Sequence, residues 1–301
     1  MTQTRFPRLY PAQVCFVVDD VDKAVDECVA SFGWGPFHRF TAPVPEAHYR
    51  DWTGSKTTDV ALGMAGKVQV ELIHVHEGHD TVEAYQARYG AGFQHMGISC
   101  RDREQAMAAL EEIGAVVDDH GEHPGIRFAF VDTPTGPGMF ELLQATGDAP
   151  PPGPESGSDE AEQGTAVALS AKVELDRATI VTHDLDRALA FYARAFRWED
   201  ARIEACTLRV GSKESRHRRA RGHAGQLLLE LVEPQSGGDD PYARHLSRGD
   251  HGLVHAGGVA QGREVPMPAT TCGEWLEEGE TFALHAWAGG PESLQLRRAS
   301  V

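Results

Sequence analysis

The chain has 301 residues, of which 41% are hydrophobic and 24% charged, a composition typical of globular proteins that argues against wholesale disorder. Its 28 Lys and Arg against 45 Asp and Glu give a net charge of −17, which has the wrong sign for a nucleic-acid binder. No apolar run approaches the roughly 18 residues of a membrane-spanning helix, and no secretory signal is visible. We therefore expect a cytoplasmic protein with neither nucleic-acid nor membrane partners, whose five scattered cysteines are reduced thiols.

The first predicted unit opens with an apolar strand at 14–18, followed by Asp20 and apolar residues at helical spacing up to Trp34. This pattern predicts a strand, an Asp N-cap and an amphipathic helix that packs one face onto a sheet. Two strands are expected at 57–64 and 67–74, and residues 37–56 are expected to form a loop.

A second unit follows the same order within the first half of the chain. Residues 92–115 again predict a strand, an Asp and a helix, and strands are expected at 127–131 and 139–143. The first half therefore has the pattern β-α-β-β-β twice.

A segment rich in Pro, Gly and acidic residues, 147–164, then separates two similar halves. Residues 178–198 repeat the pattern of 14–34 at a constant offset, so that Asp184 corresponds to Asp20 and Trp198 to Trp34. We therefore predict a duplicated domain with modules at 1–146 and 173–301, joined by a linker at 147–172.

Four polar residues interrupt apolar strands at equivalent places in the two units of the first half. They are Gln13, Glu71, His95 and Glu141. Each alone is more typical of an exposed or hydrogen-bonded strand residue, but an ionised carboxylate inside a strand is costly to bury without a partner. Together the four predict a site for one divalent metal ion, with N and O ligands that suit Zn, Co, Ni, Mn or Fe.

This layout resembles the vicinal oxygen chelate superfamily, which includes glyoxalase I, methylmalonyl-CoA epimerase, bleomycin-resistance proteins and extradiol dioxygenases. The resemblance implies an α+β fold of tandem modules, each with paired βαβββ units whose open curved sheet forms a cupped, barrel-like site. It also implies that Gln13, Glu71, His95 and Glu141 are the metal ligands and that Glu141 or Glu71 acts as the catalytic base. Asp59 matches a further catalytic carboxylate of the epimerases, although an exposed strand residue is an equal alternative.

In the second half the matching positions hold Arg177, Glu230, His255 and Gln295. Arg is permanently cationic, so we expect this module to hold no catalytic metal. The basic cluster at 213–221 is predicted to be a solvated loop, with anion binding as the alternative.

Three functions follow as expectations. The leading one is a metal-dependent isomerase, epimerase or lyase that acts on a small carbonyl substrate through an enolate stabilised by the metal. The second is a non-catalytic protein that sequesters a ligand such as an antibiotic, with Trp34, Phe37, Trp52 and Phe128 as candidate pocket residues. The third is an Fe(II) dioxygenase, which the absence of two His and one carboxylate disfavours. Superfamily members often dimerise, so a homodimer is also expected.

Overall fold

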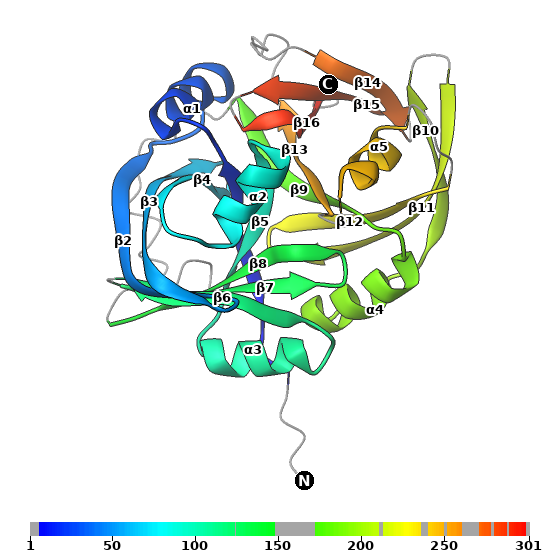
Figure 1. Ribbon diagram of the computed structural model, residues 1–301. Helices are drawn as coiled ribbons and strands as arrows, with labels where there is room; N and C mark the ends of the chain where they lie inside the picture. The colour runs from blue at the N-terminus through cyan, green and yellow to red at the C-terminus, as the bar shows by residue number, and fades with distance from the viewer. Residues whose placement is uncertain are drawn as a thin grey trace, which may run out of the picture.

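The computed structural model describes residues 6–123, 125–147, 172–210, 213–235, 240–249, 252–260, 271–277, 280–287 and 289–298, and it contains two closed barrels side by side (Figure 1). The predicted α+β fold with two similar modules is thereby confirmed. The last strand of the first barrel ends at Ala145 and the first strand of the second begins at Val173, and residues 148–171 of the predicted linker lie outside the described part.

The first module contains two units of similar order, with one extra helix between them. Its elements are β1 (Tyr10–Val17), α1 (Val21–Glu27), the π-helix η1 (Cys28–Phe32), β2 (His38–Tyr49), β3 (Trp52–Ala65), β4 (Val68–Glu77), α2 (Thr81–Tyr89), β5 (Gly92–Ser99), α3 (Arg103–Glu111), β6 (Val116–His123), β7 (Ile126–Thr133) and β8 (Gly136–Ala145). Its strands follow the order β1-β4-β3-β2-β6-β7-β8-β5 around the barrel.

The second module repeats this plan. Its elements are β9 (Val173–Val181), α4 (Leu185–Phe196), β10 (Glu204–Val210), β11 (Lys213–Ala224), β12 (Leu227–Pro234), α5 (Pro241–Arg248), β13 (Leu253–Ala260), β14 (Thr271–Glu277), β15 (Glu280–Trp287) and β16 (Gly290–Arg298). The predicted loop at 213–221 is therefore part of strand β11, which carries arginines at positions 216, 218, 219 and 221.

Aspartates cap the three helices that the repeat predicted. The side chain of Asp20 accepts a hydrogen bond from the backbone N–H of Lys23, and Asp102 and Asp184 do the same for α3 and α4. Each cap satisfies an N–H group that the first helical turn leaves without an intrahelical partner. The predicted Asp caps are confirmed.

Both sheets close, whereas the resemblance implied open ones. Strand β2 reaches β6 through three pairs, including His48 with His120, and β10 reaches β14 through two. The closure of the first barrel depends on a long β2–β3 hairpin that occupies the region expected to be a loop at 37–56. Arg50, at φ 52, provides the left-handed residue of its turn.

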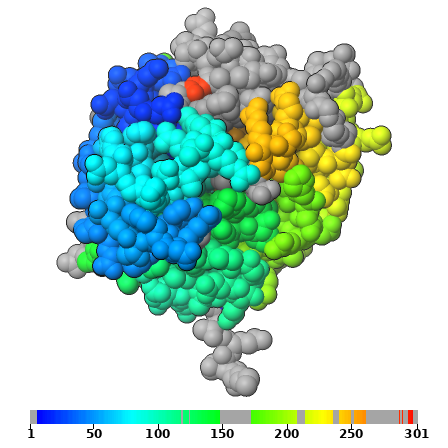
Figure 2. All heavy atoms as spheres, viewed as in Figure 1, coloured from blue at the N-terminus to red at the C-terminus, as the bar shows by residue number. Residues whose placement is uncertain are grey.

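The two modules share one apolar core, and Figure 2 shows them as adjoining parts of one face of the molecule. The indole N–H of Trp34 donates to the carbonyl of Val173 at 2.9 Å. Trp287 of the second module packs edge-on against Phe16, Phe32 and Trp34. Strand β5 of the first barrel also lies against β13 and β16 of the second.

Among the described helices, none is long and apolar enough to span a membrane.

Candidate metal centre

Strand register brings the four predicted ligands together inside the first barrel. On either side of Cys15 in β1 lie Glu71 of the parallel strand β4 and His95 of the antiparallel strand β5. Gln13 pairs with Gly97, which in turn pairs with Glu141 of β8. These four neighbouring strands carry the ligands on their inward faces, and we call the space that they and the opposite wall enclose the first cup.

His95 is the centre of this group. Its side chain is completely buried, and Nε2 lies 3.3 Å from a carboxylate oxygen of Glu71 and 3.3 Å from one of Glu141. Its Nδ1–H donates to Oε1 of Gln94 at 2.5 Å, and Gln94 itself donates to the carbonyl of Gly138. The contact with Gln94 orients the ring so that Nε2 points at the carboxylates, as in histidines that bind metal through one nitrogen and are oriented through the other.

The amide of Gln13 is oriented in a comparable way. Its Nε2 donates to Oε1 of Gln69 at 3.2 Å, while its Oε1 has no hydrogen-bond partner. The side chain lies across Gly97, where an added Cβ would come within 2.2 Å of Oε1. Any residue larger than glycine at position 97 would therefore displace the amide.

The donor atoms fit a divalent ion. Oε1 of Gln13 is buried without a hydrogen bond, and Oε2 of Glu71 and Nε2 of His95 face each other at 3.3 Å without hydrogen-bond geometry. Leaving a buried polar atom unpaired costs about 1–3 kcal/mol, so a partner that the protein chain itself does not supply is expected there. One nitrogen and several oxygens form a donor set that suits the divalent metals expected from the sequence.

Cys15 belongs to the same cluster, and sequence reasoning treated it as a small hydrophobic residue. Its thiol, one carboxylate oxygen of Glu71 and one ring nitrogen of His95 lie within 4.8 Å of one another. Burial and the carboxylates of Glu71 and Glu141 raise the pKa of this thiol well above its usual value. The Cys15 thiol is therefore neutral beside the oxygen ligands unless a bound metal displaces its proton. A Co(II)–thiolate charge-transfer band in the Co(II)-loaded protein would reveal that displacement.

Asp59 does not join this site, which corrects its expected catalytic role there. Side chains alternate along β3, so Thr58 and Val60 face the cup and Asp59 faces outward. It accepts a hydrogen bond from Thr41 at 2.7 Å and contacts Nε2 of His76 at 2.5 Å, on the far side of the sheet.

A cavity of about 260 Å³ adjoins the metal ligands. Gln13, Glu71 and Glu141 form part of its wall, and most of the remainder is apolar, with Phe128 and Phe130 of β7 prominent. Of the four aromatic residues expected at a pocket, Phe128 lines this cavity, whereas Trp34 lies in the core between the modules. The cup can therefore hold a small molecule with its polar end at the ligands.

Replacing Gln94 by leucine is expected to weaken metal binding by about 10–100-fold, the usual cost of losing a partner that orients a metal-bound histidine. The change removes the acceptor for His95 Nδ1–H and leaves every ligand in place. Competition with a chelator of known affinity measures the effect. Gln86→Leu, which alters a half-buried amide on α2 that contacts none of the four ligands, is the matched control and should leave the affinity unchanged.

Metal binding is expected to weaken about tenfold for each pH unit below 9, because the ion and a proton compete for His95. Burial lowers the pKa of His95, but the carboxylates of Glu141 and Glu71 outweigh it and raise the pKa to about 9. Near pH 7 the imidazole of the metal-free protein is therefore protonated, and binding must release that proton. Calorimetry in buffers of different ionisation enthalpy counts the protons, and release of none would contradict this prediction.

The second barrel has the same register with different residues. Arg177 pairs with Gly257, which pairs with Gln295, and Thr179 lies between Glu230 and His255. The second barrel therefore holds four residues at the same strand positions as the four ligands, as expected: Arg177, Glu230, His255 and Gln295.

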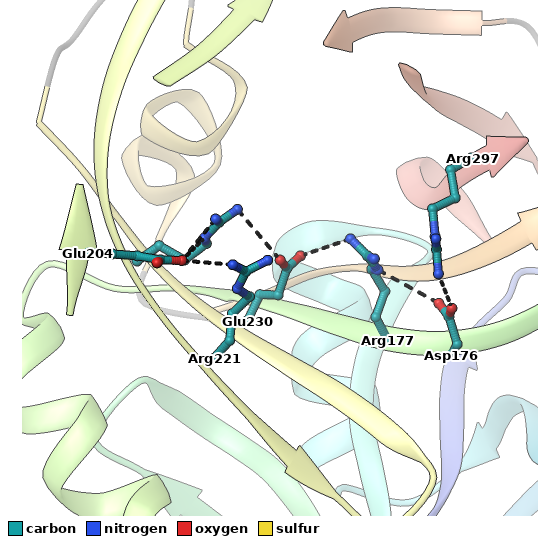
Figure 3. A network of polar contacts seen from close by, with 7 residues as sticks. Asp176, Arg177, Glu204, Arg221, Glu230 and Arg297 are labelled. Carbon is teal, nitrogen blue, oxygen red and sulfur yellow. Dashed lines mark hydrogen bonds and ion pairs between the residues drawn. The ribbon is translucent and has the colours of Figure 1, made fainter. Parts of the chain in front are cut away.

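Charge at these positions is arranged differently, as Figure 3 shows. Nη1 of Arg177 lies 3.3 Å from Glu230, and both side chains are almost fully buried. Arg219 lies 3.9 Å from the other oxygen of Glu230. The network continues outward on both sides through Glu204 with Arg221 and through Asp176 with Arg297. A fixed guanidinium therefore neutralises the Glu230 carboxylate, as an ion would neutralise Glu71 in the first cup.

Burial lowers the pKa of His255 to about 3, with His245 and Arg177 adding to the effect. His255 is therefore neutral, in contrast to His95, which lies between two carboxylates. The contrast arises because the carboxylates of Glu141 and Glu71 outweigh the effect of burial on the pKa of His95, whereas burial prevails at His255.

Comparisons with known proteins agree with this architecture. Residues 12–130 match the model of the "Glyoxalase/Bleomycin resistance protein/Dioxygenase superfamily". A triple mutant of 4-hydroxymandelate synthase from Streptomyces coelicolor is similar over 97% of this chain and 92% of that chain, with 15% identity and a TM-score of 0.57. A xylose isomerase-like TIM barrel/4-hydroxyphenylpyruvate dioxygenase fusion protein is similar over 97% of this chain and 49% of that chain, with 12% identity and a TM-score of 0.50. No curated protein matches the sequence.

Proposed function

We propose that the first module, of which residues 12–130 match the model of the glyoxalase/bleomycin resistance/dioxygenase superfamily, is a metal-dependent enzyme acting on a small oxygen-bearing substrate. The observation that carries the proposal is the convergence of four buried side chains, Gln13, Glu71, His95 and Glu141. The first three each present a potential metal-ligand atom that makes no hydrogen bond of good geometry. The adjoining cavity supplies space for the substrate.

The reaction that this donor set supports best is proton transfer next to a carbonyl group, as in an isomerase, epimerase or lyase. A bound divalent ion would serve there as a Lewis acid for two neighbouring substrate oxygens. Gln69 and Gln94 hold the Gln13 and His95 side chains in position, and most of the remaining wall of the cup is apolar. Burial raises the pKa of Glu141, against the opposing effect of His95, which favours this carboxyl group as the one that takes and returns a proton.

A second candidate is oxygen activation, and the comparisons favour it more directly than they favour an epimerase. The family description includes dioxygenases, and the name of one structure that is similar over 97% of this chain and 49% of its own contains a dioxygenase. Against it stands the donor set, because one His and two carboxylates depart from the two His and one carboxylate of Fe(II) oxygenases. The family description also includes bleomycin resistance, which keeps ligand sequestration as a third function.

Reconstitution with different metals separates these functions. Zn, Co, Ni or Mn protein should exchange the α-proton of enolisable 2-oxo acids with D2O, followed by NMR, and Glu141→Ala should lose this activity. Oxygen uptake by anaerobically loaded Fe(II) protein, with no proton exchange by the other metals, would establish the dioxygenase instead. Protein that gains no metal under any of these conditions would contradict the enzyme proposal and favour ligand sequestration.

A further inference from the structure

The outer face of the first barrel carries a second group of metal-ligating side chains, on the other side of the sheet from the first cup. It comprises Asp59 on β3 and His74 and His76 on β4, and we call it the outer triad. Asp59 lies opposite His74 in the antiparallel register, and His76 follows two residues later on the same face of β4. The β3–β4 hairpin therefore brings the three side chains together.

Two side chains of the outer triad are in direct contact. Nε2 of His76 lies 2.5 Å from one carboxylate oxygen of Asp59, and the other oxygen accepts a hydrogen bond from Thr41 at 2.7 Å. The ring centroids of His74 and His76 are 5.1 Å apart. A zinc ion at about 2.1 Å from each ligand atom holds those atoms about 3.4 Å apart. The side chains of His76 and Asp59 are 45% and 36% exposed, so they have room for the small movement that an ion requires.

His74 is oriented in the manner of a metal ligand. Its Nδ1–H donates to the backbone carbonyl of Val18 at 3.1 Å, which leaves Nε2 as the nitrogen that can bind an ion. Histidines that bind metal are commonly held in this way through their second ring nitrogen. Gln94 holds the ring of His95 in the first cup by a contact of the same kind.

The outer triad lines an open hollow of about 520 Å³, next to the start of α1, which packs against β3 and β4. Asp19, Asp20 and Asp22 add three further carboxylates to its wall. Asp20 caps α1 and Asp22 pairs with Arg39 at 2.7 Å, so these two contribute negative charge rather than ligand atoms. Among the residues that line the hollow, Arg39 is the single guanidinium against four carboxylates. The hollow therefore attracts cations.

We propose that the outer triad binds a divalent ion of the zinc and copper class through Nε2 of His74, Nε2 of His76 and the carboxylate of Asp59. Two imidazoles and one carboxylate suit Zn²⁺ and Cu²⁺, whereas Ca²⁺ and Mg²⁺ prefer oxygen ligands throughout. The proposal does not rest on the metal centre of the first cup, whose ligands lie on the opposite face of the sheet. The competing view is that His76 and Asp59 form an ordinary surface hydrogen bond, and then the triad takes no ion.

Zinc uptake measured by equilibrium dialysis tests the proposal. The outer ligands are partly exposed and lose hydration and side-chain freedom on binding, so their ion is counted in the presence of free zinc rather than after its removal. The unaltered protein should take up about two zinc ions per chain, and Glu141→Ala, which lacks a ligand of the cup, about one. His76→Leu should also take up about one ion, and the double variant almost none.

His79→Leu is the matched control. The His79 side chain is 64% exposed, contacts Glu83 and is not among the residues that line the hollow. This variant should keep both ions. His76→Leu should weaken binding of the outer ion by more than about tenfold, because it removes a ligand and not merely a residue that orients one. The His76 side chain is also exposed, so the core should be unchanged, and circular dichroism checks that the fold persists.

The outcomes separate this proposal from the proposed function. Equal zinc uptake by the unaltered protein and His76→Leu would overturn the outer site, as would an equal loss in His79→Leu. Displacement of the second ion by excess Mg²⁺ would overturn it too, because that result indicates oxygen ligands alone. Uptake of a single ion that Glu141→Ala keeps and His76→Leu loses would support the outer site and contradict the metal centre of the cup. If Glu141→Ala does not fold, the unaltered protein, His76→Leu and His79→Leu still decide the matter.

Discussion

Replacing Glu141 by alanine is expected to reduce the metal content of the protein from about one ion per chain to almost none. Glu141 is a candidate metal ligand itself. Its removal should therefore lower the metal affinity by more than the about 10–100-fold that is lost with a residue that only orients a ligand. The variant also leaves His95 with a single carboxylate neighbour. Elemental analysis after exhaustive removal of free metal measures the result.

The fold of this variant should persist, because the change removes a buried ionisable group and leaves no charge unpaired that was paired before. Circular dichroism checks this point. Gln295→Ala, at the equivalent strand position of the second module, is the matched control and should keep the metal. Metal loss in the control alone would show that the wrong module has been assigned.

Replacing Arg177 by methionine is expected to destabilise the protein by about 3–5 kcal/mol, because it leaves Glu230 buried without its close cationic partner. The pair is separated by 3.3 Å, and both side chains are less than one-tenth exposed. Arg219, at 3.9 Å from Glu230, is too loosely placed to compensate fully. Urea unfolding at constant protein concentration measures the free energy of unfolding.

Arg218→Met is the control for this experiment, since Arg218 precedes Arg219 on β11 but makes its ion pairs at the surface. Its loss should change the stability little. If Arg177→Met and Arg218→Met unfold at the same urea concentration, the guanidinium does not neutralise Glu230 in the way that we describe.

The architecture was predictable because it follows local patterns. Apolar alternation placed β1, β4, β5 and β8, and an Asp followed by helical periodicity located α1, α3 and α4. Strand β2 and the first residues of β3 were not predicted, since the stretch 38–56 is rich in polar residues, contains two prolines and was interpreted as a loop. Helix α2 was also missed, because its weak apolar periodicity gives no strong signal.

The site was predictable only where the internal repeat supplied the correspondence. The four ligands converge because equivalent strand positions meet in the barrel. Gln69, Gln94 and Cys15 could not be identified, since their roles arise from cross-strand and neighbouring-side-chain contacts that no spacing reveals. Asp59 illustrates the limit, because a one-residue difference along a strand exchanges the inside of the barrel for the outside.

Because Trp287 packs against Phe16, Phe32 and Trp34, the core of the first module is completed only when the end of the chain has been synthesised. A ribosome completes the whole first module long before it reaches residue 287. During that interval the aromatic face of the nascent module has no cover, and exposed apolar surface of this kind promotes aggregation. Slower elongation late in the message should therefore lower the yield of active protein more than slower elongation early in it. Chaperones that shield nascent chains should restore the lost yield.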